Sequence, residues 1–461
     1  MPPAALSRRL QLALALAAHL GAIVAVTSYG PRQPGTDLFG LIVLSWVTFA
    51  SAALVLARTP IARPVLVVGV LAAVLQVPGV LVEAQTSTDS LRYVWDGRVQ
   101  LSGTSPYRYP PSDPALADLR DPILFPGGEP ALNRPTVHTI YPPVAQAWFT
   151  VVAAVTPVGV GTLGVRIATA GLAVAVAVLL SWLLRRSRQD PRWAAVWGWC
   201  PLVVLEAGNN AHVDVLSAAF VVLAFIAQSA RRHRWAGLAL GLAIGVKLVP
   251  ILLAPVIARE RPVRVCVGEA GTLAVVYLPH VLVAGSLVLG YLPGYVREEG
   301  YDGRTRFAML RVLLPEAWAV GAAVVIAVTT AILAARHTDP RRPWDTATWL
   351  LGVALLLACP PYAWYALPLV ACVALSRRWE WLAVALAGYP VYLADDYAGP
   401  GHAVQEWSYG LAALVVIAGT MLRQRHRFGS SPPLLDRLVT GGGRGVGGSG
   451  SRERRGRRPL P

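Results

Sequence analysis

The chain alternates long apolar runs with short basic segments. Six runs stand out because each is about as long as the ~20 residues that an α-helix needs to cross a bilayer core. They are residues 10–28, 38–57, 64–82, 163–184, 264–284 and 312–335. The runs are too long and too uniformly apolar for the strands of a membrane barrel. The pattern therefore predicts an all-α fold, a polytopic bundle of transmembrane helices.

Arginines gather at the ends of these runs, which is how positive charge marks the cytoplasmic side of a membrane protein. The clusters are Arg8 and Arg9, Arg58 and Arg63, Arg185 to Arg188, Arg231 and Arg232, Arg336 to Arg342, Arg377 and Arg378, and Arg423 to Arg427. This placement predicts a multi-pass protein of the cell membrane with both termini in the cytoplasm. Residues 83–141 then form the longest loop on the outer face, and loops of that length are usually functional.

Two further segments break the simple alternation. Residues 142–156 are apolar but short, and the positive charges balance if they form an interfacial or re-entrant helix. Residues 235–258 have basic clusters at both ends, which predicts a broken hairpin that turns near residues 246–250, where Pro250 interrupts the helix. The expected total is roughly 12 spans plus a re-entrant pair.

Four parts follow from this organisation. N-terminal transmembrane helices occupy residues 1–83, and an extracytoplasmic loop with interfacial helices occupies residues 84–157. A transmembrane helical core spans residues 158–422, and a basic, low-complexity tail that we expect to be disordered occupies residues 423–461. We expect the first apolar run to be a retained span rather than a cleaved signal peptide.

Composition agrees with a membrane protein, since 55% of the residues are hydrophobic and only 14% are charged. The net charge of +16 resides in the flanking arginines and the tail, so we do not expect nucleic acid as a partner. The four cysteines lie in apolar segments without metal or redox spacing, and we expect small core residues rather than disulfides. Motifs of nucleotide-driven pumps, dinucleotide enzymes, zinc proteases and serine hydrolases do not occur.

The outer loop begins with an unusual concentration of charge, TDSLRYVWDGRVQ, residues 88–100. On a helix Asp89, Tyr93 and Asp96 follow the spacing i, i+4, i+7 and share a face. We expect this helix to lie near the surface with a charged and aromatic side that holds a sugar and a phosphate. Asp89 is either a helix cap at the interface or a general base at a membrane-surface active site.

Polar residues near the outer ends of later spans also indicate a function, because placing an ionisable group in a membrane segment costs free energy. In EAGNNAHVDVL, residues 206–216, the open interpretations are a polar turn capped by Asp214, a metal site formed by His212 and Asp214, and a substrate pocket. Lys247, the only lysine, lies at the expected turn of the hairpin. It is either a snorkelling interfacial lysine or an intramembrane cation for an anionic head group.

Two more outer segments carry candidate chemistry. GYVREEGYDGRTRF, residues 294–307, is either a solvated loop or a phosphate clamp formed by Arg304 and Arg306. CPPYAWYALPL, residues 359–369, is either part of an aromatic belt at the interface or a stacking platform for a sugar or a prenyl chain.

Together these motifs resemble the GT-C superfamily of membrane glycosyltransferases. DSLRYVWDGRVQLSGTSPYRYPP and TIYPPVAQAWF, followed by GNNAHVDVL, GLALGLAIGVKLVPILLAP, GYVREEGYDGRTRF and PPYAWYALPL, are similar to family 87 and related polyprenyl-phosphate-mannose-dependent mannosyltransferases. The resemblance covers most of residues 85–370. The N-terminal spans and the tail are not part of the shared pattern.

The resemblance implies transfer of a sugar, mannose by analogy, from a polyprenyl-phosphate donor to a lipid-linked or glycan acceptor at the outer membrane face, with inversion. The family's first-loop aspartate matches Asp89, which would act as general base. The residues that we expect to bind substrates are Arg92, Tyr93, Asp96, Arg98, Tyr107, His138, Tyr141, Asn209, Asn210, His212, Asp214, Lys247, Glu298, Glu299, Arg304 and Arg306. We expect membrane lipid as a further partner and no cofactor, although a divalent metal stays open because metal dependence varies across the superfamily.

A transporter or flippase of a lipid-linked sugar is the alternative function. It would use the same cations for the lipid phosphate but would need no base. Transporters often contain two matching halves with paired broken helices. This chain has one predicted broken hairpin and one dominant outer loop, which favours the enzyme.

Overall fold

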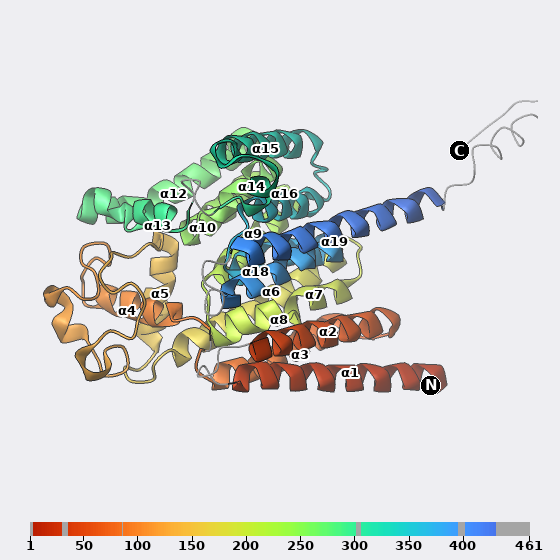
Figure 1. Cartoon of the computed structure of the whole chain (residues 1–461), viewed down its shortest axis with the longest axis horizontal. Helices are drawn as coiled ribbons and strands as arrows, with labels where there is room; N and C mark the ends of the chain where they lie inside the picture. Colours follow the sequence, from red (N-terminus) through yellow and green to blue (C-terminus); the bar gives the residue numbers. More distant parts are fainter. Residues whose placement is uncertain (1–2, 30–35, 85, 301–305, 395–401, 430–461) are drawn as a thin grey trace, which may run out of the picture. The chain divides into compact units, whose positions relative to one another are not determined.

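The computed structural model describes residues 3–29, 36–84, 86–300, 306–394 and 402–429. Within these ranges the chain forms helices joined by turns and loops, and no residue lies in a strand (Figure 1). The α-helices are α1 (Pro3–Ser28), α2 (Thr36–Arg58), α3 (Pro64–Leu81), α4 (Asp89–Leu101), α5 (Pro143–Val155), α6 (Leu163–Arg186), α7 (Ala195–Gly198), α8 (Pro201–Val203), α9 (Asp214–Ser229), α10 (His233–Val246), α11 (Ala254–Ile257), α12 (Pro262–Ala284), α13 (Leu292–Glu298), α14 (Ala308–Leu313), α15 (Glu316–His337), α16 (Pro343–Ala358), α17 (Leu367–Ser376), α18 (Leu382–Ala394) and α19 (His402–Gly429). The all-helical prediction is confirmed.

Six helical segments in the described residues are long and apolar enough to cross a membrane. They are Ser7–Ser28, Asp37–Arg58, Pro64–Leu81, Leu163–Arg186, Pro262–Glu298 and Glu316–His337. Each overlaps one of the six apolar runs, so the helices that the pattern of hydropathy predicts are present. The expected total of spans, and the side of the membrane on which each loop lies, stay predictions.

Proline and glycine shape how the helices begin and pack. α3, α5, α12 and α16 each begin with proline, whose fixed φ suits the first helical position and whose missing N–H is not needed there. α10 and α12 lie side by side because Gly237 lets the backbones touch: a Cβ there would stand 2.0 Å from the carbonyl oxygen of Val265.

The predicted helix break before Pro250 is present. α10 ends at Val246, the residue whose carbonyl the Pro250 ring would meet in a continuous helix. Lys247 is extended, with φ −157° and ψ 143°, and a 3-10 turn, Val249–Leu253, leads into α11. Lys247 pairs with the first residue of α9, whereas Ile257 accepts a hydrogen bond from Gln228 near the end of α9. The chain therefore reverses at Lys247.

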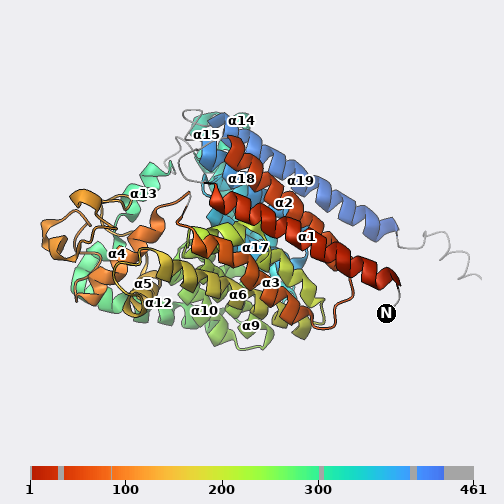
Figure 2. The same cartoon turned by 90° about the horizontal axis from the view of Figure 1, so that it is seen from below.

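α4, α5 and the long loop between them gather beside α13 at one end of the helices that follow them, and both views agree on this (Figures 1 and 2). α4 packs closely on α5, because a Cβ on Gly97 would stand 2.4 Å from the carbonyl oxygen of Phe149. Contrary to expectation, α4 does not present a charged side at the surface. Arg92 and Asp96 are both buried, whereas Asp89 and Arg98 are partly exposed.

The chain divides into two units, Met1–Val415 and Val416–Pro461, and the description of the second unit ends at Gly429. All the features below belong to the first unit. Its four cysteines are free thiols. Cys200, Cys359 and Cys372 are buried as expected, but Cys266 is exposed on α12, most of whose side chains are likewise exposed and apolar.

Candidate functional site

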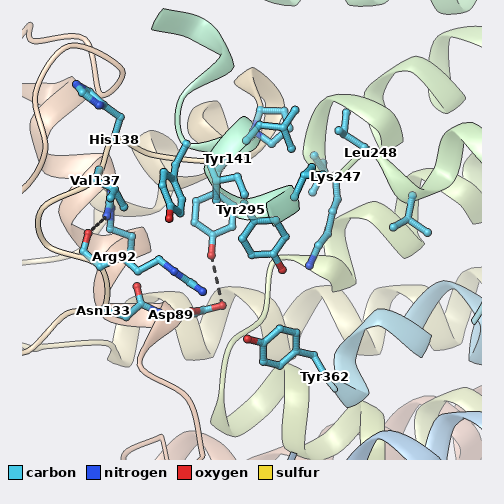
Figure 3. A pocket seen from close by; sticks show the side chains of 18 of the residues that line it. Asp89, Arg92, Asn133, Val137, His138, Tyr141, Lys247, Leu248, Tyr295 and Tyr362 are labelled. Atoms are coloured by element: carbon cyan, nitrogen blue, oxygen red, sulfur yellow. Dashed lines mark hydrogen bonds between the residues drawn. The ribbon is translucent and has the colours of Figure 1, made fainter. Parts of the chain in front are cut away.

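A cavity of about 430 Å³ opens between the start of α4, the loop before α5, the end of α10, α13 and the turn before α17. We call it the site cavity. Its wall carries one carboxylate, Asp89, and the cations Arg92, Arg134 and Lys247. Tyrosine and tryptophan side chains form much of the remaining wall, and they are Tyr141, Tyr277, Tyr291, Tyr295, Tyr362, Trp364, Tyr365 and Tyr392. Figure 3 shows Asp89, Tyr141 and Lys247 turned toward the same space.

Asp89 is the first residue of α4, where the positive end of the helix dipole favours a negative charge. Asn133 donates a hydrogen bond of 2.5 Å to its Oδ1, and the Tyr141 hydroxyl donates one of 3.3 Å to its Oδ2 (Figure 3). Burial raises the pKa of Tyr141, and the charge of Asp89 raises it further, so the phenol stays a donor. Each carboxylate oxygen keeps a second acceptor position, and the side chain is 20% exposed.

Lys247 supplies a positive charge on the wall of the same cavity. Its Nζ lies 2.8 and 2.9 Å from the two carboxylate oxygens of Asp214 and 4.1 Å from the centre of the Tyr365 ring. Asp214 is almost fully buried, whereas the lysine side chain is 24% exposed. The pair therefore presents the cation, and not the carboxylate, to the cavity.

Arg134 ties the loop before α5 to α13. Its guanidinium pairs with Glu298 at 2.6 Å and stacks over the Tyr295 ring, 5.6 Å from its centre. Its backbone has φ 46°, a strained conformation for a residue other than glycine. Its carbonyl oxygen accepts a hydrogen bond from Arg92, so the loop is fixed from α4 as well as from α13.

His212 lies behind Asp89 and is fully buried. Its Nδ1 is 3.6 Å from Asp89 Oδ2, its Nε2 is 3.4 Å from Glu206 Oε2, and the ring stacks on Trp364 with 3.8 Å between centres. A π-helical turn, Val204–Asn209, and Ala211 with φ 57° set up this position. Such π-turns and strained residues are frequent at functional sites.

Arg92 and Asp96 form a buried ion pair with 2.9 Å between Nε and Oδ1. The other Asp96 oxygen accepts hydrogen bonds from Thr139 at 2.6 Å and Gln146 at 2.9 Å. The remaining donors of Arg92 bind the carbonyl oxygens of Arg134 and Val137. Asp96 therefore holds the loop to α4 and α5 and does not line the site cavity.

This network gives a first prediction. We expect Asp96→Ala to destabilise the protein by about 3–5 kcal/mol, because it leaves the Arg92 charge buried without its partner. The apparent Tm of the full chain in detergent measures this loss. Asp118→Ala, at an exposed position of the same loop, is the control and should leave Tm unchanged. The double variant Arg92→Met/Asp96→Leu should regain much of the loss, and a Tm as low as that of Asp96→Ala would contradict the charge argument.

A second cavity, of about 440 Å³, adjoins the first and shares Val249 and Tyr365 with it. We call it the apolar cavity. Its other lining residues come from the segment after Lys247 and from α15, α16 and α17, together with Phe307 and Pro360, and apart from Thr330 they are apolar. The two cavities together place a polar, charged chamber next to a hydrocarbon-lined one.

Among the residues predicted from the sequence, five line the site cavity: Asp89, Arg92, His138, Tyr141 and Lys247. His212 and Asp214 contact two of these five from behind. The structure does not bring the others to the cavity wall, and they are Tyr93, Asp96, Arg98, Tyr107, Asn209, Asn210, Glu298, Glu299 and Arg306. Arg304 lies outside the described residues.

Several of these others have clear structural partners instead. Arg98 pairs with Asp121, and Arg306, which is 2% exposed, pairs with Glu299. The Tyr107 hydroxyl donates to the Tyr141 carbonyl at 2.8 Å. Asn209 donates to the carbonyl oxygens at the end of α3. These residues connect segments of the chain to one another and do not line the site cavity.

Sequence reasoning missed Asn133, Arg134, Tyr291, Tyr295 and Tyr392, which all line the site cavity. No spacing rule distinguishes Asn133 and Arg134 from the other polar residues of their loop. The sequence leaves Tyr362, Trp364 and Tyr365 open between a membrane belt and a stacking platform, and all three line the cavity. Within the described ranges no three His, Cys, Asp or Glu side chains converge as metal ligands do.

Comparison with known proteins matches part of the chain to one family model. No protein with curated annotation and no solved structure matches the chain. A model of glycosyltransferase family 87 matches residues 139–361, which contribute Tyr141, Tyr277, Tyr291, Tyr295 and Lys247 to the site cavity. Over residues 139–361 the chain thus belongs to glycosyltransferase family 87, and the protein is a membrane glycosyltransferase of the GT-C type.

Proposed function

We propose that the protein transfers a sugar, with mannose as the first candidate, from a polyprenyl-phosphate donor to a hydroxyl of a lipid or glycan acceptor at the extracytoplasmic face of the cell membrane. One observation carries the proposal: the partly exposed carboxylate of Asp89 and the ammonium group of Lys247 lie on the wall of one cavity. A base and a phosphate-binding cation are the two charged groups that this reaction needs.

The two adjoining cavities match the two halves of such a donor. The phosphate sits against Lys247, and the isoprenoid tail follows the apolar cavity between the segment after Lys247 and α15 to α17. The sugar occupies the site cavity, where flat aromatic side chains such as Tyr295 offer apolar faces to its C–H bonds. The acceptor hydroxyl enters beside Asp89.

The proposed transfer needs only the donor, the acceptor, Asp89 and Lys247. The acceptor oxygen attacks the anomeric carbon, and its proton passes to the Asp89 carboxylate. The bond between the anomeric carbon and the phosphate oxygen breaks, and its electron pair leaves with the polyprenyl phosphate. Attack opposite to the leaving group inverts the anomeric centre. The phosphate gains a second negative charge as it leaves, so Lys247 interacts most strongly with the transition state.

His212 fits this reaction as a positioning residue, because it touches Asp89 from the side opposite the cavity. Its ring separates the carboxylates of Asp89 and Glu206, at 3.6 and 3.4 Å, and the Trp364 stack fixes its plane. Glu206 is held in turn by the Tyr389 hydroxyl at 2.7 Å and by Asn210 at 2.9 Å. The base is therefore backed by a polar chain that reaches into the helical core.

We expect His212→Phe, which keeps the stack on Trp364 but loses both nitrogens, to lower kcat by roughly ten- to hundredfold, the scale of one contact to a charged group. KM for the donor should change little, because the ring does not line the cavity. Steady-state kinetics over a range of pH measure both effects. A lowered Tm with an unchanged kcat and an unchanged pH profile would show that His212 has only a packing role.

The direct test of the proposed function uses the purified full chain in detergent. We expect polyprenyl-phosphate mannose and an extract of cell-envelope lipids to give a product heavier by one hexose, detected by mass spectrometry. Polyprenyl-phosphate glucose and a nucleotide sugar serve as the comparison donors. Transfer from the nucleotide sugar but from neither lipid donor would overturn the proposal.

A further inference from the structure

A third cavity, of about 510 Å³, lies at the other end of α10 from Lys247. Since α10 runs from His233 to Val246, about 21 Å of helix separates this cavity from the site cavity. We call it the basic cavity, and its charged and polar lining is Arg231, His233, Arg259, Glu260, Arg261 and Arg264. Four arginines thus face one space that holds a single carboxylate.

The four arginines of the basic cavity have exposed side chains. No ion pair joins any of the four to a carboxylate in the part of the chain that the structure describes. Among the described residues, their side chains form one hydrogen bond, from Arg259 to the carbonyl oxygen of Arg336, at 3.4 Å. Like charges around one space repel one another, and a bound anion would relieve that repulsion.

Two helices also begin at this cavity. α10 starts at His233 and α12 at Pro262, and the contact of Gly237 with Val265 keeps the two starts level. Helix starts carry partial positive charge and favour anions. Here the cap positions are instead occupied by Arg232 and Arg261, and neither side chain accepts a capping hydrogen bond. The backbone field and the side chains therefore add to the same positive potential.

His233 provides an independent sign of a ligand. It lines the basic cavity, is only 8% exposed, and its buried Nδ1 has no hydrogen-bond partner among the described residues. A buried polar atom without a partner is costly, so a group that the structure does not contain is expected to meet it.

We propose that the basic cavity binds a phosphate group. Phosphate has acceptor oxygens in several directions, and arginine guanidinium groups bind it through paired hydrogen bonds. The two sources are the head group of an anionic lipid and free inorganic phosphate. This site is separate from the donor phosphate beside Lys247 and does not depend on the proposed sugar transfer.

The test compares these sources on the full chain in lipid nanodiscs. We expect nanodiscs that contain phosphatidic acid in phosphatidylcholine to raise Tm relative to phosphatidylcholine alone, and native mass spectrometry to find retained phosphatidic acid. Inorganic phosphate, with chloride at equal ionic strength as its control, tests the free source. A rise in Tm with inorganic phosphate alone would assign the site to free phosphate.

Variants locate the effect. Arg259→Gln/Arg264→Gln should weaken phosphate retention roughly ten- to hundredfold, the scale of lost charge-assisted hydrogen bonds. Arg185→Gln/Arg186→Gln, at the end of α6, removes the same charge outside the basic cavity and should leave retention intact. His233→Phe, which keeps all the arginines, should also weaken it. Equal losses in the α6 control, or no binding from either source, would overturn the proposal.

Discussion

Asp89→Asn is expected to abolish sugar transfer, with kcat lowered by about 10²–10⁴-fold, the range that a positioned general base contributes. Asparagine keeps the size of the side chain and accepts the hydrogen bonds from Asn133 or Tyr141 at one oxygen, but it cannot take a proton from the acceptor. Donor binding should survive, because the proposed phosphate contact is at Lys247. Product formation by mass spectrometry and binding of a polyprenyl-phosphate donor, measured on the same protein, separate these two quantities.

Asp118→Asn is the matched control for this experiment. Asp118 belongs to the loop between α4 and α5 but is exposed and does not line the site cavity, so its neutral variant should transfer sugar at the normal rate. Asp89→Glu is a second comparison, because it keeps the base but moves it by one methylene and should retain partial activity. An Asp89→Asn protein that is folded and transfers sugar at the normal rate would rule out Asp89 as the base.

The six candidate membrane spans could be predicted from the sequence because helix length and apolar composition alone define them. The turn at Lys247 could be predicted for a related reason: basic residues at both ends of residues 235–258 argue against a simple span, and Pro250 cannot donate the backbone hydrogen bond of a continuous helix. Both inferences use information that is local in the chain, and the structure agrees with both.

The site could be predicted from the sequence only in part, because it is formed by contacts between segments that are distant in the chain. Helical spacing correctly put Asp89 and Asp96 on one helix, but seven residues advance about 10 Å along its axis, so only Asp89 reaches the cavity. The partner of Asp89, Asn133, is 44 positions away in an irregular loop. The sequence leaves Arg306 open between a solvated loop and a phosphate clamp, and it does not indicate that Glu299, seven positions earlier, pairs with it.

The buried ion pairs of the described residues differ in how far the cation is exposed. Arg92 with Asp96 and Arg306 with Glu299 have both members buried, which fits a role in fixing loops. Lys247 with Asp214 differs, because the lysine is 24% exposed and its partner 4%. Holding a cation at a cavity wall by a carboxylate behind it is a way to orient charge for a ligand. That asymmetry singles out Lys247 among the paired cations.

Lys247→Met is therefore expected to lower kcat by about 10²–10³-fold, the cost of removing one group that stabilises charge in a transition state. KM for the donor should rise as well, but by less, because the donor phosphate carries one negative charge before transfer and two after it. Steady-state kinetics with a polyprenyl-phosphate donor give both values. An Lys247→Met protein with normal kcat would exclude Lys247 from the phosphate site.

The single variant also leaves the buried Asp214 charge without its partner, which could unfold the protein for a reason unrelated to catalysis. Lys247→Met/Asp214→Asn removes both charges and should restore Tm toward the parent value. We expect the double variant to stay as inactive as Lys247→Met, because the cation is still missing from the cavity wall. If restoring Tm also restored transfer, the lysine would be a partner of Asp214 only, and the leaving phosphate would need another source of positive charge.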